Sequence, residues 1–178
     1  MKRIFIAISI SEGLQNKILE WGKSYENLPV RWLKGKNLHI TLIPPWYCEE
    51  EKIQDIEKII DEVLKKISSF EIVFRKISYG PNLRQPRLIW IEAEPQKIAS
   101  NLKTELEKSL GKKAEHRPWL VHMTLARFRP ETFSSFPIKK LDEIINWEEK
   151  VESAVIMESM LSPTGADYKI LHKADLYG

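Results

Sequence analysis

Two short strings of the form His-x-Thr-Leu constrain the fold of this chain more than any other feature. One is HITL at residues 39–42, within the apolar run NLHITLIPPW, and the other is HMTL at residues 122–125, within WLVHMTLARF. Both runs are rich in strand-forming residues, and a helical pattern with strand patterns accompanies each of them. We interpret this doubled order as a weak internal repeat. It predicts two similar αβ lobes, related by pseudo-symmetry, whose equivalent strands meet at a shared groove.

The rest of the chain is predicted to alternate between strands and helices, with no linker or low-complexity segment. Apolar and β-forming runs predict strands at residues 2–10, 37–43, 69–80, 86–94, 120–128, 150–162 and 167–178. Apolar residues at helical spacing predict helices at residues 12–28, 49–67 and 96–111 and a short helical piece at 138–145. We expect Ser11 to be the N-cap of the first helix and Gly111 to end the third. Pro44 and Pro45 are expected to end the second strand, and residues 163–166 to form the last turn.

Length and composition indicate an ordinary globular protein. The 178 residues are 43% hydrophobic and 30% charged, and we expect one domain over residues 1–178 and a monomer. No run approaches the roughly 18 consecutive apolar residues of a membrane span, so no membrane association is expected. The opening MKRIFIAISISEG lacks a cleavage site of small residues and is predicted to be a strand rather than a signal peptide. The single cysteine, Cys48, excludes an intramolecular disulfide and fits a cytoplasmic location.

The charges are distributed unevenly along the chain. A net charge of +3 is too small to indicate nucleic-acid binding by itself. The basic residues, however, gather in VRWLKGK, RKISYGPNLRQPR, GKKAEHR and LARFR, and the acidic residues gather in CEEEKIQDIEKIIDE and LDEIINWEEKVE. If the basic segments share one face, they form a positive surface that suits a polyanion.

The two His-x-Thr pairs are suited to chemistry at a phosphate. In a strand, residues i and i+2 point the same way, so His39 shares a face with Thr41, and His122 shares one with Thr124. Opening a phosphodiester without metal needs a general base for water and a general acid for the leaving alkoxide, and imidazole serves in both roles near neutral pH. The threonine hydroxyls would donate hydrogen bonds to the non-bridging oxygens. The residues alone leave open which histidine is the acid.

Other residues bear on the same site. Arg127 could bind the phosphate, but strict alternation places it on the face opposite His122, so it joins the site only if the strand ends or bulges after Leu125. A metal site is the competing use of histidines. The sequence contains no HxH or HExxH string and no second cysteine, so we expect neither metal nor cofactor. His116 and His172 have no partner at motif spacing and are expected to be structural or surface residues.

At these motifs the chain resembles the two-histidine phosphoesterase superfamily, specifically the LigT-like RNA 2′,3′-cyclic phosphodiesterases, also called 2′-5′ RNA ligases. The likeness extends from RIFIAISI through both His-x-Thr-Leu strings to IMESMLSPTGADYKIL. It implies an α+β bilobal fold with mainly antiparallel sheets around a central cleft. It also implies hydrolysis of RNA 2′,3′-cyclic phosphate ends to 2′-phosphomonoesters, with His39 as proton donor and His122 as proton acceptor. Thr41, Thr124 and Arg127 would hold the phosphate.

Two departures from the family pattern concern the edges of the groove. Val121 stands where the family usually has proline, and IPPW replaces the usual Phe-Leu-Gly after the first motif, so substrate size is open. Trp46, Tyr47 and Trp119 flank the motifs and could stack on a base, although packing is the simpler role for each. Three other functions stay open: 2′-5′ RNA ligation by the same site, hydrolysis of small cyclic nucleotides, and noncatalytic binding of RNA ends.

Overall fold

The protein is known from a computed structural model, which describes residues 1–114, 118–162 and 165–178. The strands are β1 (Lys2–Ser9), β2 (Arg31–Trp32), β3 (His39–Cys48), β4 (Phe70–Gly80), β5 (Leu88–Ala93), β6 (His122–Arg127), β7 (Asp142–Val151), β8 (Ser153–Ser162) and β9 (Gly165–Asp175). The helices are α1 (Glu12–Lys23), α2 (Ile53–Leu64) and α3 (Lys97–Ser109), with short 3-10 turns η1 (Gly35–Asn37), η2 (Glu50–Lys52) and η3 (Pro130–Ser135). The predicted α+β class is confirmed.

The strands form one continuous sheet with a narrow junction in its middle. Its order is β7-β4-β5-β6-β3-β1-β8-β9, with β2 added to β6, and these strand pairs are antiparallel. The two motif strands, β3 and β6, are neighbours at the centre, yet only one residue pair, Ile40 and Met123, is in register between them. The junction therefore divides the sheet into two halves of four main strands, and each half has a motif strand as its inner edge.

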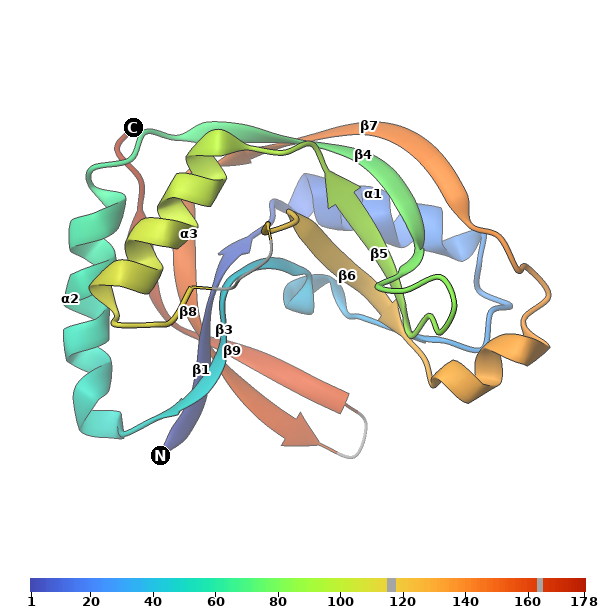
Figure 1. The fold of residues 1–178 in the computed structure, drawn as a ribbon, viewed down its shortest axis with the longest axis horizontal. Helices are drawn as coiled ribbons and strands as arrows, with labels where there is room; N and C mark the ends of the chain where they lie inside the picture. Colours follow the sequence, from blue (N-terminus) through green and yellow to red (C-terminus); the bar gives the residue numbers. More distant parts are fainter. Residues whose placement is uncertain (115–117, 163–164) are drawn as a thin grey trace.

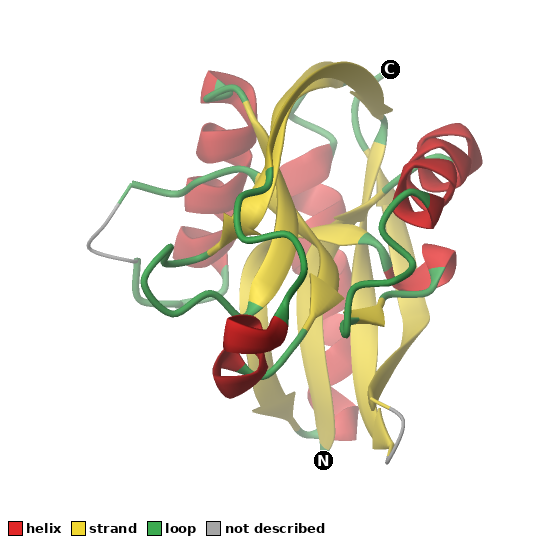
Figure 2. Cartoon of the chain, turned by 90° about the vertical axis from the view of Figure 1, so that its right-hand side faces the viewer, coloured by secondary structure: helices red, strands yellow, loops and turns green. Residues whose placement is uncertain are grey.

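The predicted internal repeat has a counterpart in the structure. β1, α1 and β3 form one strand-helix-motif strand unit, and β5, α3 and β6 form the other. In both units the first strand pairs antiparallel with its own motif strand. The helices cross over, because α1 contacts β7 in the half that contains β6, whereas α3 packs against α2 and β3 (Figure 1). Figure 2 shows the strands between helices on either side. The crossed helices tie the two halves together.

Two hydrophobic clusters lie on different parts of the sheet. The larger one joins the inward faces of all three helices to the sheet and includes Ile40, Leu42, Met123 and Leu125 of the motif strands. The smaller one consists of buried side chains from β1 and β8, packed against one partly buried ring from β9: Phe5, Ala7, Val155, Met157 and Tyr168. The smaller cluster forms an apolar floor on the face of the sheet that carries the first histidine.

Several predicted elements are confirmed. Ser11 caps α1, since its hydroxyl accepts a hydrogen bond from the backbone N–H of Leu14 at 3.2 Å. Gly111, beyond the end of α3, has φ of 60°, the left-handed conformation that glycine adopts without strain. The helix predicted at 12–28 ends earlier, at Lys23, and continues as turns. The predicted turn at 163–166 begins at residues 163–164, which lie outside the described residues.

The predicted end of the second strand at Pro44 and Pro45 is wrong. β3 continues to Cys48, because a bulge accommodates the two prolines: Ile6 pairs with Ile43, and Ile4 pairs with Trp46. One strand thus advances by three residues while its partner advances by two. At a bulge, a residue without an N–H removes no regular ladder bond, so proline is tolerated there.

The short helical piece predicted at 138–145 is also wrong, because Asp142 begins the ten-residue strand β7. This strand pairs along β4 from Asp142 beside Ser78 to Val151 beside Phe70. Pairing with an existing strand overrides the weak helical preference of its charged residues.

None of the helices in the described residues has the length and hydropathy that a membrane-spanning helix needs.

Candidate active site

The two motifs present their polar side chains on one face of the sheet. Ile40 and Met123, the paired residues of β3 and β6, are both fully buried in the larger core. The histidine and threonine on either side of each are half-buried and point to the opposite face. Extending the antiparallel register by one residue in each direction sets His39 beside Thr124 and Thr41 beside His122. The fold therefore brings together the four residues that the sequence predicted.

Both imidazole rings are held in the same way. Nδ1 of His39 lies 2.7 Å from the carbonyl oxygen of Asn37, and Nδ1 of His122 lies 2.9 Å from that of Leu120. A carbonyl oxygen only accepts, so Nδ1 carries the hydrogen in both rings. Each Nε2 is then left for the face that the motifs share. Each histidine bonds the carbonyl two residues before it, so this arrangement is built into the local chain at both sites.

The surroundings of His39 are aromatic and enclosed. Its ring centroid lies 4.9 Å from that of Phe5 and 5.2 Å from that of Tyr168, with Tyr168 edge-on. Burial lowers the pKa of His39 from 6.5 to about 4; the bond to Asn37 opposes this shift, and the charges of Arg127 and His122 add to it. Arg127 and His122 are therefore near enough to His39 to affect the pKa of this ring.

The surroundings of His122 are built around Trp90 of β5. The two ring centroids are 4.9 Å apart. The indole Nε1 of Trp90 donates to the hydroxyl of Ser78 at 3.1 Å, which fixes the ring against β4. The ring lies directly over Gly80, where an added Cβ would be 2.4 Å from the indole. Gly80 is therefore needed for Trp90 to lie flat and support His122.

Arg127 meets the condition set by the sequence. Between β5 and β6 the register shifts: Ile89 pairs with Ala126, while Trp90 pairs with Thr124, so Leu125 is an extra residue. Leu125 and Ala126 are consecutively buried, and the exposed Arg127 follows them. The bulge reverses the alternation and returns Arg127 to the face of Thr124. The sequence allowed Arg127 into the site only if the strand ended or bulged after Leu125; the structure has a bulge at Leu125 itself and so meets this condition.

The comparison with known families agrees with this geometry. The model of the 2′-5′ RNA ligase superfamily matches residues 19–160. The chain belongs to the 2′-5′ RNA ligase superfamily. A protein of Bacillus subtilis named RNA 2′,3′-cyclic phosphodiesterase is 32% identical over 127 residues, which is 69% of each chain. A protein of the same name from Archaeoglobus fulgidus is 28% identical over 177 residues, covering 95% of this chain and 97% of that one.

Solved structures share the fold of this superfamily member. The crystal structure of TT0787 of Thermus thermophilus has a TM-score of 0.80 at 24% identity and covers 99% of this chain and 98% of its own. Escherichia coli LigT in complex with 3′-AMP has a TM-score of 0.78 at 21% identity, with 99% of both chains covered. The predicted bilobal, mainly antiparallel LigT-like fold is confirmed.

A hollow of about 550 Å³ adjoins both motifs in this superfamily member. Thr41 and His122 line it, together with Trp90, Trp119 and Pro44. Of the three aromatics that the sequence placed near the motifs, Trp119 alone is among its lining residues. The ammonium group of Lys112 lies over the ring of Trp46, 4.1 Å from the ring centroid, and Tyr47 is largely exposed.

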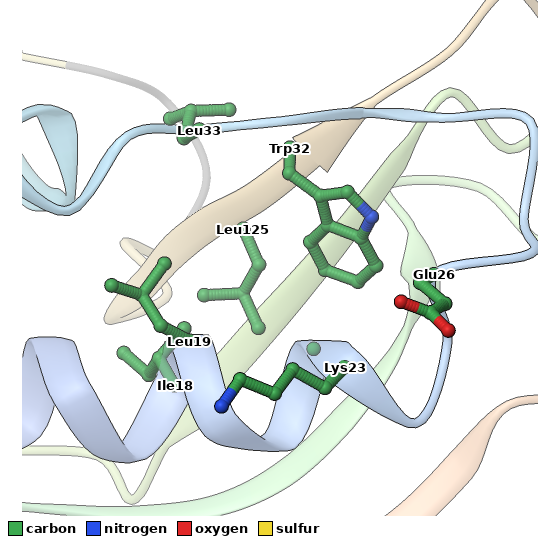
Figure 3. A pocket seen from close by; sticks show the side chains of 8 residues that line it. Ile18, Leu19, Lys23, Glu26, Trp32, Leu33 and Leu125 are labelled. Atoms are coloured by element: carbon green, nitrogen blue, oxygen red, sulfur yellow. The ribbon is translucent and has the colours of Figure 1, made fainter.

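A second hollow, of about 200 Å³, lies away from this chemistry (Figure 3). Lys23 and Glu26 are the charged residues of its otherwise mostly apolar lining, in which Trp32, Leu33 and Leu125 face Ile18 and Leu19 of α1. Leu125 belongs to the buried face of β6. This hollow is a gap in packing between α1 and the sheet, with no titratable group of the two motifs in its wall.

The structure describes one of the two remaining histidines, and it leaves the expected absence of a metal untested. His172 bonds the carboxylate of Asp61 at 2.9 Å and joins β9 to α2, which agrees with the expectation of a structural or surface residue. His116 lies outside the described residues. Among the residues that are described, no three His, Cys, Asp or Glu side chains form a cluster; the absence of a metal stays a prediction. Sequence reasoning missed Phe5, Trp90 and Tyr168, because nothing in their local strings separates a site wall from a core residue.

Proposed function

We propose that this protein hydrolyses RNA 2′,3′-cyclic phosphate ends to 2′-phosphomonoesters without a metal ion. The observation that carries the proposal is the pairing of Ile40 with Met123, which sets two His-x-Thr faces side by side. An acid and a base on either side of one phosphorus are what in-line displacement requires. The relatives named RNA 2′,3′-cyclic phosphodiesterase support this choice of substrate.

The proton movements follow from the orientation of the rings. In our proposal, Nε2 of neutral His122 takes a proton from water as the water oxygen forms a bond to phosphorus. The bond from phosphorus to O3′ breaks, and Nε2 of protonated His39 gives its proton to O3′. The reaction leaves a 2′-phosphate, a 3′-hydroxyl, a neutral His39 and a protonated His122. Exchange with solvent then restores both histidines.

His39 must carry a proton on Nε2 before it can act as the acid. Its pKa of about 4 in the free protein means that the ring is neutral at pH 7. A phosphodiester anion bound between the two motifs offsets the nearby positive charge of Arg127 and accepts a hydrogen bond from the protonated ring. Substrate binding therefore raises the pKa of His39, so that the proton arrives together with the phosphate.

The other polar groups hold the phosphate in this scheme. No hydrogen bond joins the hydroxyl of Thr41 or Thr124 to another described residue, so both are free to donate to non-bridging oxygens. Arg127 adds a planar fork with fixed charge. The hollow that adjoins His122 offers Trp119 and Pro44 as walls for the terminal nucleoside.

Hydrolysis of adenosine 2′,3′-cyclic phosphate in the presence of excess EDTA tests the proposal. We expect full activity, with phosphorus NMR showing the 2′-phosphate as the product. His122→Ala, purified in parallel, controls for contaminating nuclease. Loss of activity on chelation would overturn the metal-free mechanism, and a 3′-phosphate product would overturn the assignment of the leaving oxygen.

A further inference from the structure

Four arginines converge at the end of β6, beyond the motif residues. Arg31, Arg87, Arg127 and Arg129, here called the arginine cluster, line one hollow of about 530 Å³. The other lining residues are proline, leucine, phenylalanine and threonine, and none of them is acidic. This part of the surface is therefore strongly positive, although the whole chain has a net charge of only +3.

Backbone pairing holds the cluster together. Arg31 of β2 is the register partner of Arg127 of β6, and Leu88 of β5 pairs with Arg127 from the other side. The N–H of Phe128 donates to the carbonyl oxygen of Arg87 at 3.0 Å, and the N–H of Arg87 donates to that of Gly80 at 2.9 Å. These bonds fix the positions from which the guanidinium groups extend, so the convergence follows from the sheet.

The cluster lacks compensating charge. Within the described part of the chain, no carboxylate forms an ion pair with any of its four guanidinium groups. Like charges directly opposite each other in a ladder destabilise the pairing, as at Arg31 and Arg127. An anion bound between them removes this repulsion and accepts bidentate hydrogen bonds from the arginine forks. The arrangement is suited to a phosphate.

The cluster adjoins the catalytic face on two sides. Arg87 also lines the hollow that contains Thr41 and His122. Arg31 and Arg127 also line a hollow of about 440 Å³ together with Tyr168, the neighbour of His39, and the buried Asn37. A ligand held at the two motifs can therefore extend onto the cluster.

We propose that the arginine cluster is a second phosphate site, which binds the 5′-phosphodiester of the nucleotide whose 2′,3′-cyclic phosphate lies at the two histidines. This inference rests on the proposed function, because it takes the same RNA end as its ligand. Arg127 is shared between the two phosphates, and Arg87 also borders the hollow of the first site, whereas Arg31 and Arg129 are assigned to the second site alone. A cyclic mononucleotide without a 5′-phosphate leaves the second site empty, so the protein should prefer RNA ends to small cyclic nucleotides.

Three substrates separate the two sites. They are adenosine 2′,3′-cyclic phosphate, the same compound with a 5′-phosphate, and a trinucleotide with a 2′,3′-cyclic end. We expect kcat/KM to be at least tenfold higher for the second and third than for the first. The slope of log kcat/KM against log salt should also be steeper for the trinucleotide by about 0.7 for each additional phosphate bound.

Single substitutions identify the residues of the second site. Arg129→Gln and Arg31→Gln should each lower kcat/KM for the trinucleotide about tenfold and leave hydrolysis of adenosine 2′,3′-cyclic phosphate within twofold. The matched control is Lys58→Gln, which removes one positive charge from an exposed position on α2. It should change kcat/KM for neither substrate, and circular dichroism would show that all variants are folded.

The outcomes separate failure of the second site from failure of the first. If adenosine 2′,3′-cyclic phosphate is hydrolysed but a 5′-phosphate gives no advantage, the second site is overturned and the proposed function stands. If Arg129→Gln and Arg31→Gln lower kcat/KM equally for both substrates, the cluster supports the catalytic face instead, which also overturns the second site. If none of the three substrates is hydrolysed, the proposed function itself fails.

Discussion

The two motif strands place the same residues in unlike surroundings. On β3, Phe5 and Tyr168 enclose the ring of His39, and its pKa falls to about 4. On β6, the ring of His122 has one aromatic neighbour among the described residues, Trp90, and lines the 550 Å³ hollow. In both strands Nδ1 bonds the carbonyl oxygen two residues earlier.

This difference shows what a repeated motif determines and what it leaves to its surroundings. The repeat determines which face the imidazole and the hydroxyl occupy and which ring nitrogen faces the substrate. The lowered pKa of His39 comes from burial by side chains that other strands supply, such as Phe5 of β1 and Tyr168 of β9. Two copies of one motif thus have unequal surroundings, as the proposed division into an acid and a base requires.

The largest expected effect is on catalysis, when either histidine is removed. His39→Ala and His122→Ala should each lower kcat/KM for a 2′,3′-cyclic nucleotide by about 10²- to 10⁴-fold, because each supplies one of the two proton transfers. Steady-state kinetics with the purified variants measures the loss. His172→Gln, which alters a histidine bonded to Asp61, is the control and should keep full activity. Wild-type rates in either alanine variant would remove that histidine from the mechanism.

The threonines come next, and they test whether the two motifs bind one phosphate. Thr41→Val and Thr124→Val should each lower kcat/KM by about ten- to a hundredfold, since each removes one donor to a charged oxygen. Thr104→Val, on the exposed face of α3, is the matched control. A loss in one variant alone would show that only one motif holds the phosphate.

The third prediction concerns the dependence of folding on pH. The pKa of His39 is about 4 when folded and 6.5 when unfolded, so between these values the unfolded chain binds more protons. The contribution of neutral His39 to stability is complete above pH 6.5 and is lost as the pH falls to about 4, by roughly 3 kcal/mol in all. The free energy of unfolding, measured with urea, should fall between pH 7 and pH 4.5. This fall should be about 2 to 3 kcal/mol larger in the wild type than in His39→Gln. An equal fall in the free energy of unfolding of the two proteins would show that the surroundings of His39 do not lower its pKa.

The smallest expected effect concerns the support of His122. Gly80→Ala places a methyl group against the indole of Trp90 and should lower the free energy of unfolding by about 2 kcal/mol. Gly22→Ala is the matched control, because its Cβ would lie at an ordinary 3.6 Å from the ring of Trp32. The control should be neutral or slightly stabilising in a helix. Equal effects of the two substitutions would mean that Trp90 does not depend on Gly80.

The sequence predicted the face that carries the two motifs better than it predicted the walls around it. His39, Thr41, His122 and Thr124 could be placed from the period of a strand, because that period depends only on local geometry. The position of Arg127 depends on whether β6 ends or bulges before it. The sequence could state this condition but could not show that a bulge occurs at Leu125. The bulge depends on pairing with β5, which is a contact between segments far apart in the chain.

The misjudged elements have the same origin. Pro44 and Pro45 ordinarily stop a strand, but the bulge between β1 and β3 accommodates both. The segment that begins β7 has no strong preference of its own and becomes a strand because β4 offers an edge. Tyr168 reaches His39 through a hairpin more than a hundred residues later in the chain. Local patterns cannot reveal such neighbours.

The most direct test is an NMR titration of the ring protons of His39 and His122, with and without adenosine 2′-phosphate, the expected type of product. We expect a pKa of about 4 for His39 in the free protein and a clear rise when the ligand is bound, because in our proposal the phosphate lies between the two rings. His122 should respond to the same ligand. A pKa for His39 that stays near 4 at saturating ligand would contradict the claim that the two motifs share one phosphate.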